Sequence, residues 1–213
     1  MREKQFGPGK HLPTFGPDGT PAWQDPATRL AWWRTVLFRC GMLLGSMATM
    51  VLWLMAVVFT PPWLLVLWLP VVLVLLYPFM LSLAHLFRTR RIRRVLRVYP
   101  WQAHHGVAQL ASNGTTRFVL PSPDQPEKTV TLRYGNYLGS GFTFWVREVK
   151  AERVDEVWFA GDPRFLAVVA VPGPRRLLAL GQPEATNPSM APRRKGVSPE
   201  AKERARAAGA RVG

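Results

Sequence analysis

Forty-eight consecutive residues, 40–87, contain no Asp, Glu, Lys or Arg. Only the Thr-Pro-Pro sequence at 60–62 interrupts their apolar character, and it divides the stretch into blocks of 20 and 25 residues. A helix needs about 20 apolar residues to cross a hydrocarbon core roughly 30 Å thick. The sequence therefore predicts two transmembrane helices, at about 36–59 and 62–87, within a helical hairpin that occupies residues 29–87.

A signal peptide and a buried helical hairpin both fit this stretch less well. A secretory signal peptide would begin nearer the N-terminus, whereas about 35 polar and mixed residues precede the first span and no small-x-small cleavage site follows it. A buried hairpin of a soluble all-α protein would carry charges on its outer faces, and 48 residues without charge exceed what such a core provides. We therefore favour the membrane.

Basic residues lie on one side of the predicted hairpin only. Arg29, Arg34 and Arg39 precede the first span, and the link between the spans carries no charge. Six arginines follow the second span: Arg88, Arg90, Arg91, Arg93, Arg94 and Arg97. Because basic residues near span ends are retained in the cytoplasm, we expect a multi-pass protein of the inner (cell) membrane with both termini cytoplasmic.

The segment 88–97 has the pattern of a basic amphipathic juxtamembrane helix. Ile92, Val95, Leu96 and Tyr99 form an apolar stripe beneath the arginines. We expect the six arginines to contact lipid headgroups and the stripe to enter the acyl boundary of an anionic phospholipid surface. The alternative is a linker helix whose stripe packs on the following domain. Nucleic acid would be attracted by the same charges and is the lesser expectation.

Small residues recur at four-residue spacing inside the first span, at Gly41, Gly45 and Thr49. This spacing allows another helix backbone to approach closely. We expect the second span of the same hairpin to pack there, and a homo-oligomer contact is the alternative.

Residues 98–181 have the pattern of a small antiparallel all-β barrel or sandwich domain on the cytoplasmic side. The Asn113-Gly114 pair between two short apolar runs predicts a β-hairpin. Alternating apolar residues predict further strands at 130–134 and 142–146, and turn residues divide 154–180 into a three-strand meander.

The two ends of the chain differ from this core in composition. Residues 1–28 are rich in Gly, Pro and polar residues and are expected to form a disordered leader. Residues 182–213 are expected to form a basic flexible tail that contains one short helix, capped by Ser198 and stopped at Gly209.

Residues with catalytic or ligand-binding patterns are few. The Gly-rich stretch 135–141 lacks the Gly-Lys-Ser/Thr of a phosphate-binding loop, and His104 and His105 would point to opposite faces of a strand. Cys40 is the only cysteine. We therefore predict no enzymatic activity, no catalytic, cofactor-binding or metal-ligating residue, and no cofactor.

The layout of residues 30–181 resembles that of uncharacterised two-pass inner-membrane proteins of high-GC Gram-positive bacteria, in which a cytoplasmic β domain follows a helical hairpin. From the hairpin, the arginine helix and the β domain together, we expect a non-enzymatic membrane-anchored adaptor or accessory protein that presents its β domain, with an unidentified protein partner, at an anionic membrane surface. An accessory subunit of a transport, secretion or DNA-transfer membrane complex is the alternative.

Overall fold

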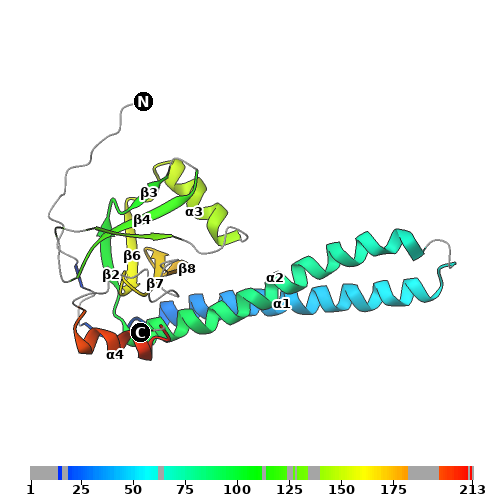
Figure 1. The fold of residues 1–213 in the computed structure, drawn as a ribbon, viewed down its shortest axis with the longest axis horizontal. Coiled ribbons are helices and arrows are strands. Elements are labelled where there is room, and N and C mark those ends of the chain that lie inside the picture. The colour runs from blue at the N-terminus through cyan, green and yellow to red at the C-terminus, as the bar shows by residue number, and fades with distance from the viewer. Residues whose placement is uncertain are drawn as a thin grey trace.

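A long antiparallel helical hairpin projects from a β domain (Figure 1). The hairpin consists of α1 (Pro26–Val58) and α2 (Leu65–Val98), and the β domain lies at its open end. The computed structural model describes residues 14–15, 19–61, 65–111, 114–123, 127, 129–133, 140–181, 197–210 and 212.

The first helix begins earlier than the sequence indicates. Asp25 caps α1, because its carboxylate accepts hydrogen bonds from the backbone N–H groups of Ala27 (3.1 Å) and Thr28 (3.0 Å). The 3-10 turn η1 (Ala22–Gln24) precedes the cap, and the Ala22 N–H donates to the Tyr99 carbonyl at 2.9 Å. The expected disorder of residues 1–28 therefore does not extend to residues 21–28, which are ordered against the end of α2.

The second helix is continuous from the apolar stretch to the β domain. It runs for 34 residues, which is about 50 Å at 1.5 Å per residue, and it includes Pro70 and Pro78 without a break. Residues 88–97 are therefore the last turns of α2 and not a separate element. Among the described residues, α1 and α2 are long and apolar enough to cross a membrane.

Much of the apolar surface of the hairpin is exposed. The most apolar window of α1 has no buried residue, and only 11% of the corresponding window of α2 is buried. Leu52 is 71% exposed, Val58 76% and Val74 69%. The two helices are thus unlike the buried core helices of a soluble protein.

The eight described strands follow one another in the order β1-β2-β6-β7-β8-β5-β4-β3, with antiparallel pairing throughout. A single residue pair, Arg133 with Gly181, joins β5 to β8, so the strands divide into two antiparallel sheets. Their bounds are β1 (Thr14–Phe15), β2 (Gln102–His105), β3 (Ala108–Leu110), β4 (Thr116–Pro121), β5 (Thr129–Arg133), β6 (Glu156–Gly161), β7 (Leu166–Val171) and β8 (Arg175–Gly181).

The prediction of a β domain after the hairpin is confirmed, but its all-β character is not. The β3-β4 hairpin, with Gly114 at φ +73°, and the β6-β7-β8 meander lie where the sequence places them. The strands described do not close into a barrel, because β1 and β3 form the two ends of the strand order. A helix also covers one side of the domain, so the domain is not purely β.

That helix, α3 (Ser140–Lys150), replaces the strand expected at 142–146, and this prediction was wrong. Trp145 is fully buried and its ring meets that of Phe118 edge-on at 5.3 Å, with Val149 one turn further on the same face. A short apolar run fits both a two-residue and a 3.6-residue period, and packing on the sheet decides between them here.

Strand β7 separates two hydrophobic cores. Its Val168 and Ala170 pack toward the base of the hairpin, whereas Ala167 and Val169 pack toward α3 and the β3-β4-β5 sheet. The apolar stripe of α2 belongs to the first core: Ile92 (5% exposed), Val95 (1%), Leu96 (0%) and Tyr99 (7%). The expectation that this stripe enters the acyl boundary is therefore corrected, since the β domain covers it.

The C-terminal helix α4 (Pro199–Ala207) also docks on the domain. Ser198 caps it as predicted, and Gly209 follows it at φ +85°. Ala201 and Ala205 are buried with Phe165. The flexible tail expected from 182 onward therefore does not include residues 197–210.

Gly161 offers a sharp test of the β6-β7 turn. It has φ +139°, and an added Cβ would clash with the Leu166 carbonyl oxygen. Gly161→Ala should therefore lower the free energy of unfolding by about 3 kcal/mol, from backbone strain and overpacking together. Gly114→Ala, also at positive φ but with open space around it, should cost only about 1 kcal/mol. Denaturant unfolding of the full chain in micelles checks the difference, and equal costs would contradict the geometry.

Candidate functional site

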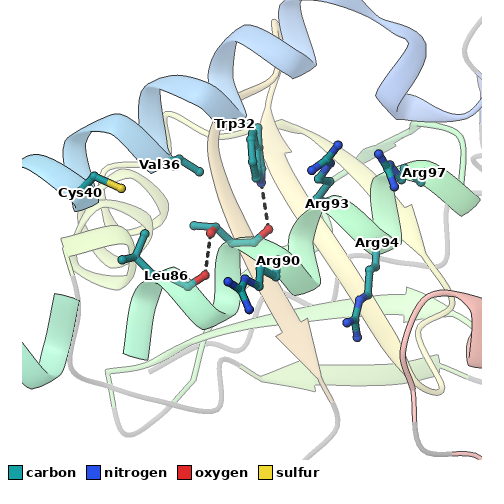
Figure 2. Close-up of a pocket in the computed structure, with 9 residues that line it drawn as sticks. Trp32, Val36, Cys40, Leu86, Arg90, Arg93, Arg94 and Arg97 are labelled. Atoms are coloured by element: carbon teal, nitrogen blue, oxygen red, sulfur yellow. Dashed lines mark hydrogen bonds between the residues drawn. The ribbon is translucent and has the colours of Figure 1, made fainter. Parts of the chain in front are cut away.

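A groove lies between α1 and α2 at the base of the hairpin (Figure 2). Its cavity volume is about 510 Å³, within the range of small-ligand sites. The two helices supply the lining residues that belong to the described part of the chain, and the groove they form is here called the basic groove: Trp32, Val36 and Cys40 from α1, and Leu86, Thr89, Arg90, Arg93, Arg94 and Arg97 from α2.

Helical periodicity brings these residues together. On α1 the lining residues are four apart, at 32, 36 and 40, and they share one helix face. On α2 the residues at 86, 90, 93 and 97 recur at intervals of three and four. The groove is therefore the contact between two helix faces, one mainly apolar and one largely basic.

A buried hydrogen bond fixes the two faces in register. The Trp32 Nε1–H donates to the backbone carbonyl of Thr89 at 2.9 Å, and the Thr89 hydroxyl donates to the Leu86 carbonyl at 2.7 Å (Figure 2). Trp32 is only 7% exposed, whereas its neighbour Trp33 is 52% exposed. Trp32 is thus a buried aromatic residue in the lining of the groove.

Arg93 lies against two indole rings that also contact each other. Its guanidinium carbon lies 5.1 Å from the ring centre of Trp23 and 5.4 Å from that of Trp32, and the two rings meet edge-on at 5.4 Å. Arg97 lies 5.9 Å from the Trp23 ring. Cation–π attraction holds both arginines on the indole rings. The Nε atom of Arg93 is buried and has no hydrogen-bond partner in the described part of the chain.

No carboxylate of the described residues lines the basic groove. In the described ranges, the ion pairs involve Glu148, Asp155 and Asp162 on the β domain, and none reaches the four arginines of the groove. Four guanidinium groups without an acidic partner in those ranges create a strongly positive potential at this position. Such a site can bind anions, and phosphate in particular, through charge-assisted hydrogen bonds.

The structure divides the six arginines predicted to contact lipid. Arg90, Arg93, Arg94 and Arg97 line the groove, whereas Arg88 and Arg91 do not. The sequence did not indicate Trp23 as part of the site, because Trp23 falls in the segment expected to be disordered. The spacing of Trp32, Val36 and Cys40 was the available signal.

The small residues of α1 form an exposed face of the helix. Gly41, Gly45 and Thr49 are exposed, and no described atom lies within 4 Å of a Cβ built on either glycine. The expected packing of the second span against this face is therefore wrong for the described residues. The face points away from the hairpin partner, and the homo-oligomer alternative stays a prediction.

The remaining chemical groups form no second site in the part of the chain that the structure describes. Among those residues, no group of three His, Cys, Asp or Glu side chains could hold a metal ion. The Gly-rich stretch at 135–141 lies almost wholly outside the described residues. Asp162 and Arg164 form a buried ion pair at 2.7 Å that rigidifies the β6-β7 turn. Burial, followed by the charge of Asp162, raises the pKa of Tyr99 to about 12.

No protein-family model matches the chain, and neither a curated protein nor a solved structure matches it. The function is therefore inferred from the geometry of the described residues.

His104 generates a prediction about pH. It is 6% exposed, and burial, with a smaller contribution from His105, lowers its pKa from 6.5 to about 4. The unfolded chain therefore takes up a proton before the folded chain does, and folding loses up to about 3 kcal/mol as the pH falls from 6.5 to 4. Thermal unfolding in micelles across this range should show the loss. His104→Gln should flatten it, and the matched His105→Gln should not; an unchanged pH profile in His104→Gln would contradict the assignment.

Proposed function

We propose that this protein is a non-enzymatic, membrane-anchored adaptor that holds its β domain against the cytoplasmic surface of an anionic membrane. The observation that carries the proposal is the continuity of α2. One helix begins in the apolar hairpin and ends with Leu96 fully buried in the core of the β domain. The hairpin and the domain are thus joined by a helix and not by a loose linker.

The exposed surface of the hairpin supports membrane insertion. A contiguous apolar surface of this size is unstable in water and needs lipid or protein to cover it. On α1 the residues from 40 to 58 carry no charge and span about 28 Å at 1.5 Å per residue, close to the thickness of a hydrocarbon core. The length of this uncharged segment, its apolar composition and the exposure of the hairpin surface therefore all support membrane insertion.

The charged ends of the two helices support a single membrane boundary. Because Trp32 contacts Thr89, the arginines at 29–39 of α1 lie beside those at 88–97 of α2. One bilayer surface can accommodate all of them, with the β domain immediately outside it. The positive-inside rule then favours the cytoplasmic side for the domain.

As an adaptor, the protein would bind a partner protein through its β domain. The alternative is an accessory subunit whose hairpin packs in a larger membrane complex. The open face at Gly41, Gly45 and Thr49 favours a further helix contact in either case. Crosslinking in native membranes from a photoreactive residue at position 45 distinguishes them. Recovery of multi-spanning proteins would favour the alternative, and recovery of this chain alone would favour a homo-oligomer.

Topology is the direct test of the proposal. In a Cys40→Ser background, Pro61→Cys at the hairpin tip should react with a membrane-impermeant maleimide in intact cells. Lys150→Cys and Glu203→Cys, both at exposed positions of the domain, should react only after permeabilisation. Labelling of the domain in intact cells, or extraction of the whole chain by alkaline carbonate, would contradict the proposal.

A further inference from the structure

We propose that the basic groove binds one anionic phospholipid per chain, with the phosphate among Arg90, Arg93 and Arg97 and an acyl chain along Val36, Cys40 and Leu86. This inference rests on the proposed insertion of the hairpin into the membrane. In this proposal three of the six arginines bind one phosphate at a defined position, whereas the sequence suggested only a general attraction of all six to a charged surface.

The groove is apolar at one end and basic at the other, and this order matches the acyl chains and the phosphate of a phospholipid in the adjacent leaflet. Cys40 and Leu86 lie at one end, and Arg93 and Arg97 lie toward the other (Figure 2). The apolar end faces the hairpin tip and the basic end faces the β domain. A lipid of the adjacent leaflet has the same polarity, since its acyl chains point to the bilayer centre and its phosphate faces the cytoplasm.

The basic end is organised before any ligand binds. Arg93 lies against the rings of both Trp23 and Trp32, so little side-chain entropy is lost when it binds an anion. Arg90 and Arg97 are exposed and can close on the phosphate from either side.

The apolar wall selects a lipid over other phosphates. Val36, Cys40 and Leu86 offer nothing to a free phosphate ion or to a nucleic acid backbone, but they can pack against methylene groups. Because no described carboxylate is part of the lining, the charge of the arginines is left for the ligand. The shared chemistry is a phosphate ester, and the acyl chain identifies its source.

The test uses native mass spectrometry of the full chain released from nanodiscs of phosphatidylglycerol and phosphatidylcholine with identical acyl chains. The wild type should retain one phosphatidylglycerol per chain and lose phosphatidylcholine. Arg90→Gln/Arg97→Gln should weaken retention about tenfold or more, since two charge-assisted contacts are lost. The matched pair Arg88→Gln/Arg91→Gln removes the same charge from the same helix outside the groove and should change retention less than about twofold.

A second variant tests the acyl wall without changing charge. Val36→Trp should fill the apolar end and reduce retention of the intact lipid, while binding of glycerophosphoglycerol, which has no acyl chains, should persist in wild type and variant alike. Displacement of the lipid by inorganic phosphate at equal concentration would reduce the site to an adventitious ion only. Displacement by a short oligonucleotide at equal concentration would assign the arginines to nucleic acid.

Equal losses in the two arginine pairs would overturn the proposed site. Membrane anchoring would then remain, with the arginines acting as a diffuse charge. If the wild type itself were extracted by alkaline carbonate, the proposed function would fail before the groove was tested, so the two failures are distinguishable.

Discussion

The architecture depends on the burial of the last turns of α2 in the β domain. Val95 and Leu96 are 1% and 0% exposed, and they pack with Ala160, Val168 and Ala170 on one face of the sheet. Removing a buried Leu side chain from such a core costs about 2 to 5 kcal/mol. The contact therefore fixes the direction in which the hairpin leaves the domain, and the groove and the membrane boundary follow from that direction.

Two buried indole N–H groups extend this contact to α1. Trp32 donates to the Thr89 carbonyl at 2.9 Å, and Trp101 donates to the Thr28 hydroxyl at 2.9 Å. The same hydroxyl donates to the capping carboxylate of Asp25 at 2.7 Å. The start of α1 is thus tied both to α2 and to the first residues of the β domain. An indole left without its acceptor in this core would cost free energy, so these bonds favour one register of the hairpin.

The same register assembles the basic groove. If α1 shifted by one turn, Trp32 would lose its hydrogen bond to the Thr89 carbonyl and its contact with Arg93. The packing that holds the domain on the hairpin is therefore also what places four arginines beside an apolar wall. Trp32 therefore has two roles. Its indole N–H joins α1 to α2 through the Thr89 carbonyl, and its ring contacts Arg93 in the proposed site.

The sequence predicted those features that depend on composition and short-range pattern. The uncharged stretch at 40–87 predicted two long apolar helices, and alternation with turn residues predicted the β6-β7-β8 meander. It misassigned features decided by tertiary packing: the helix at Ser140–Lys150, the ordered residues around Trp23, and the outward face at Gly41. The groove itself combines residues 32–40 with 86–97, and periodicity on one helix cannot show which face of another will oppose it.

The rigid connection of the hairpin to the β domain through α2 underlies both the proposed function and the proposed lipid site. It is measured most directly by the distribution of distances between spin labels at Val74→Cys on α2 and Lys150→Cys on α3, in a Cys40→Ser background in nanodiscs. Both positions are exposed. A rigid connection predicts one narrow distribution, which a short glycine insertion after Phe87 should broaden. A broad distribution in the uninterrupted chain, matching that of the insertion variant, would contradict it.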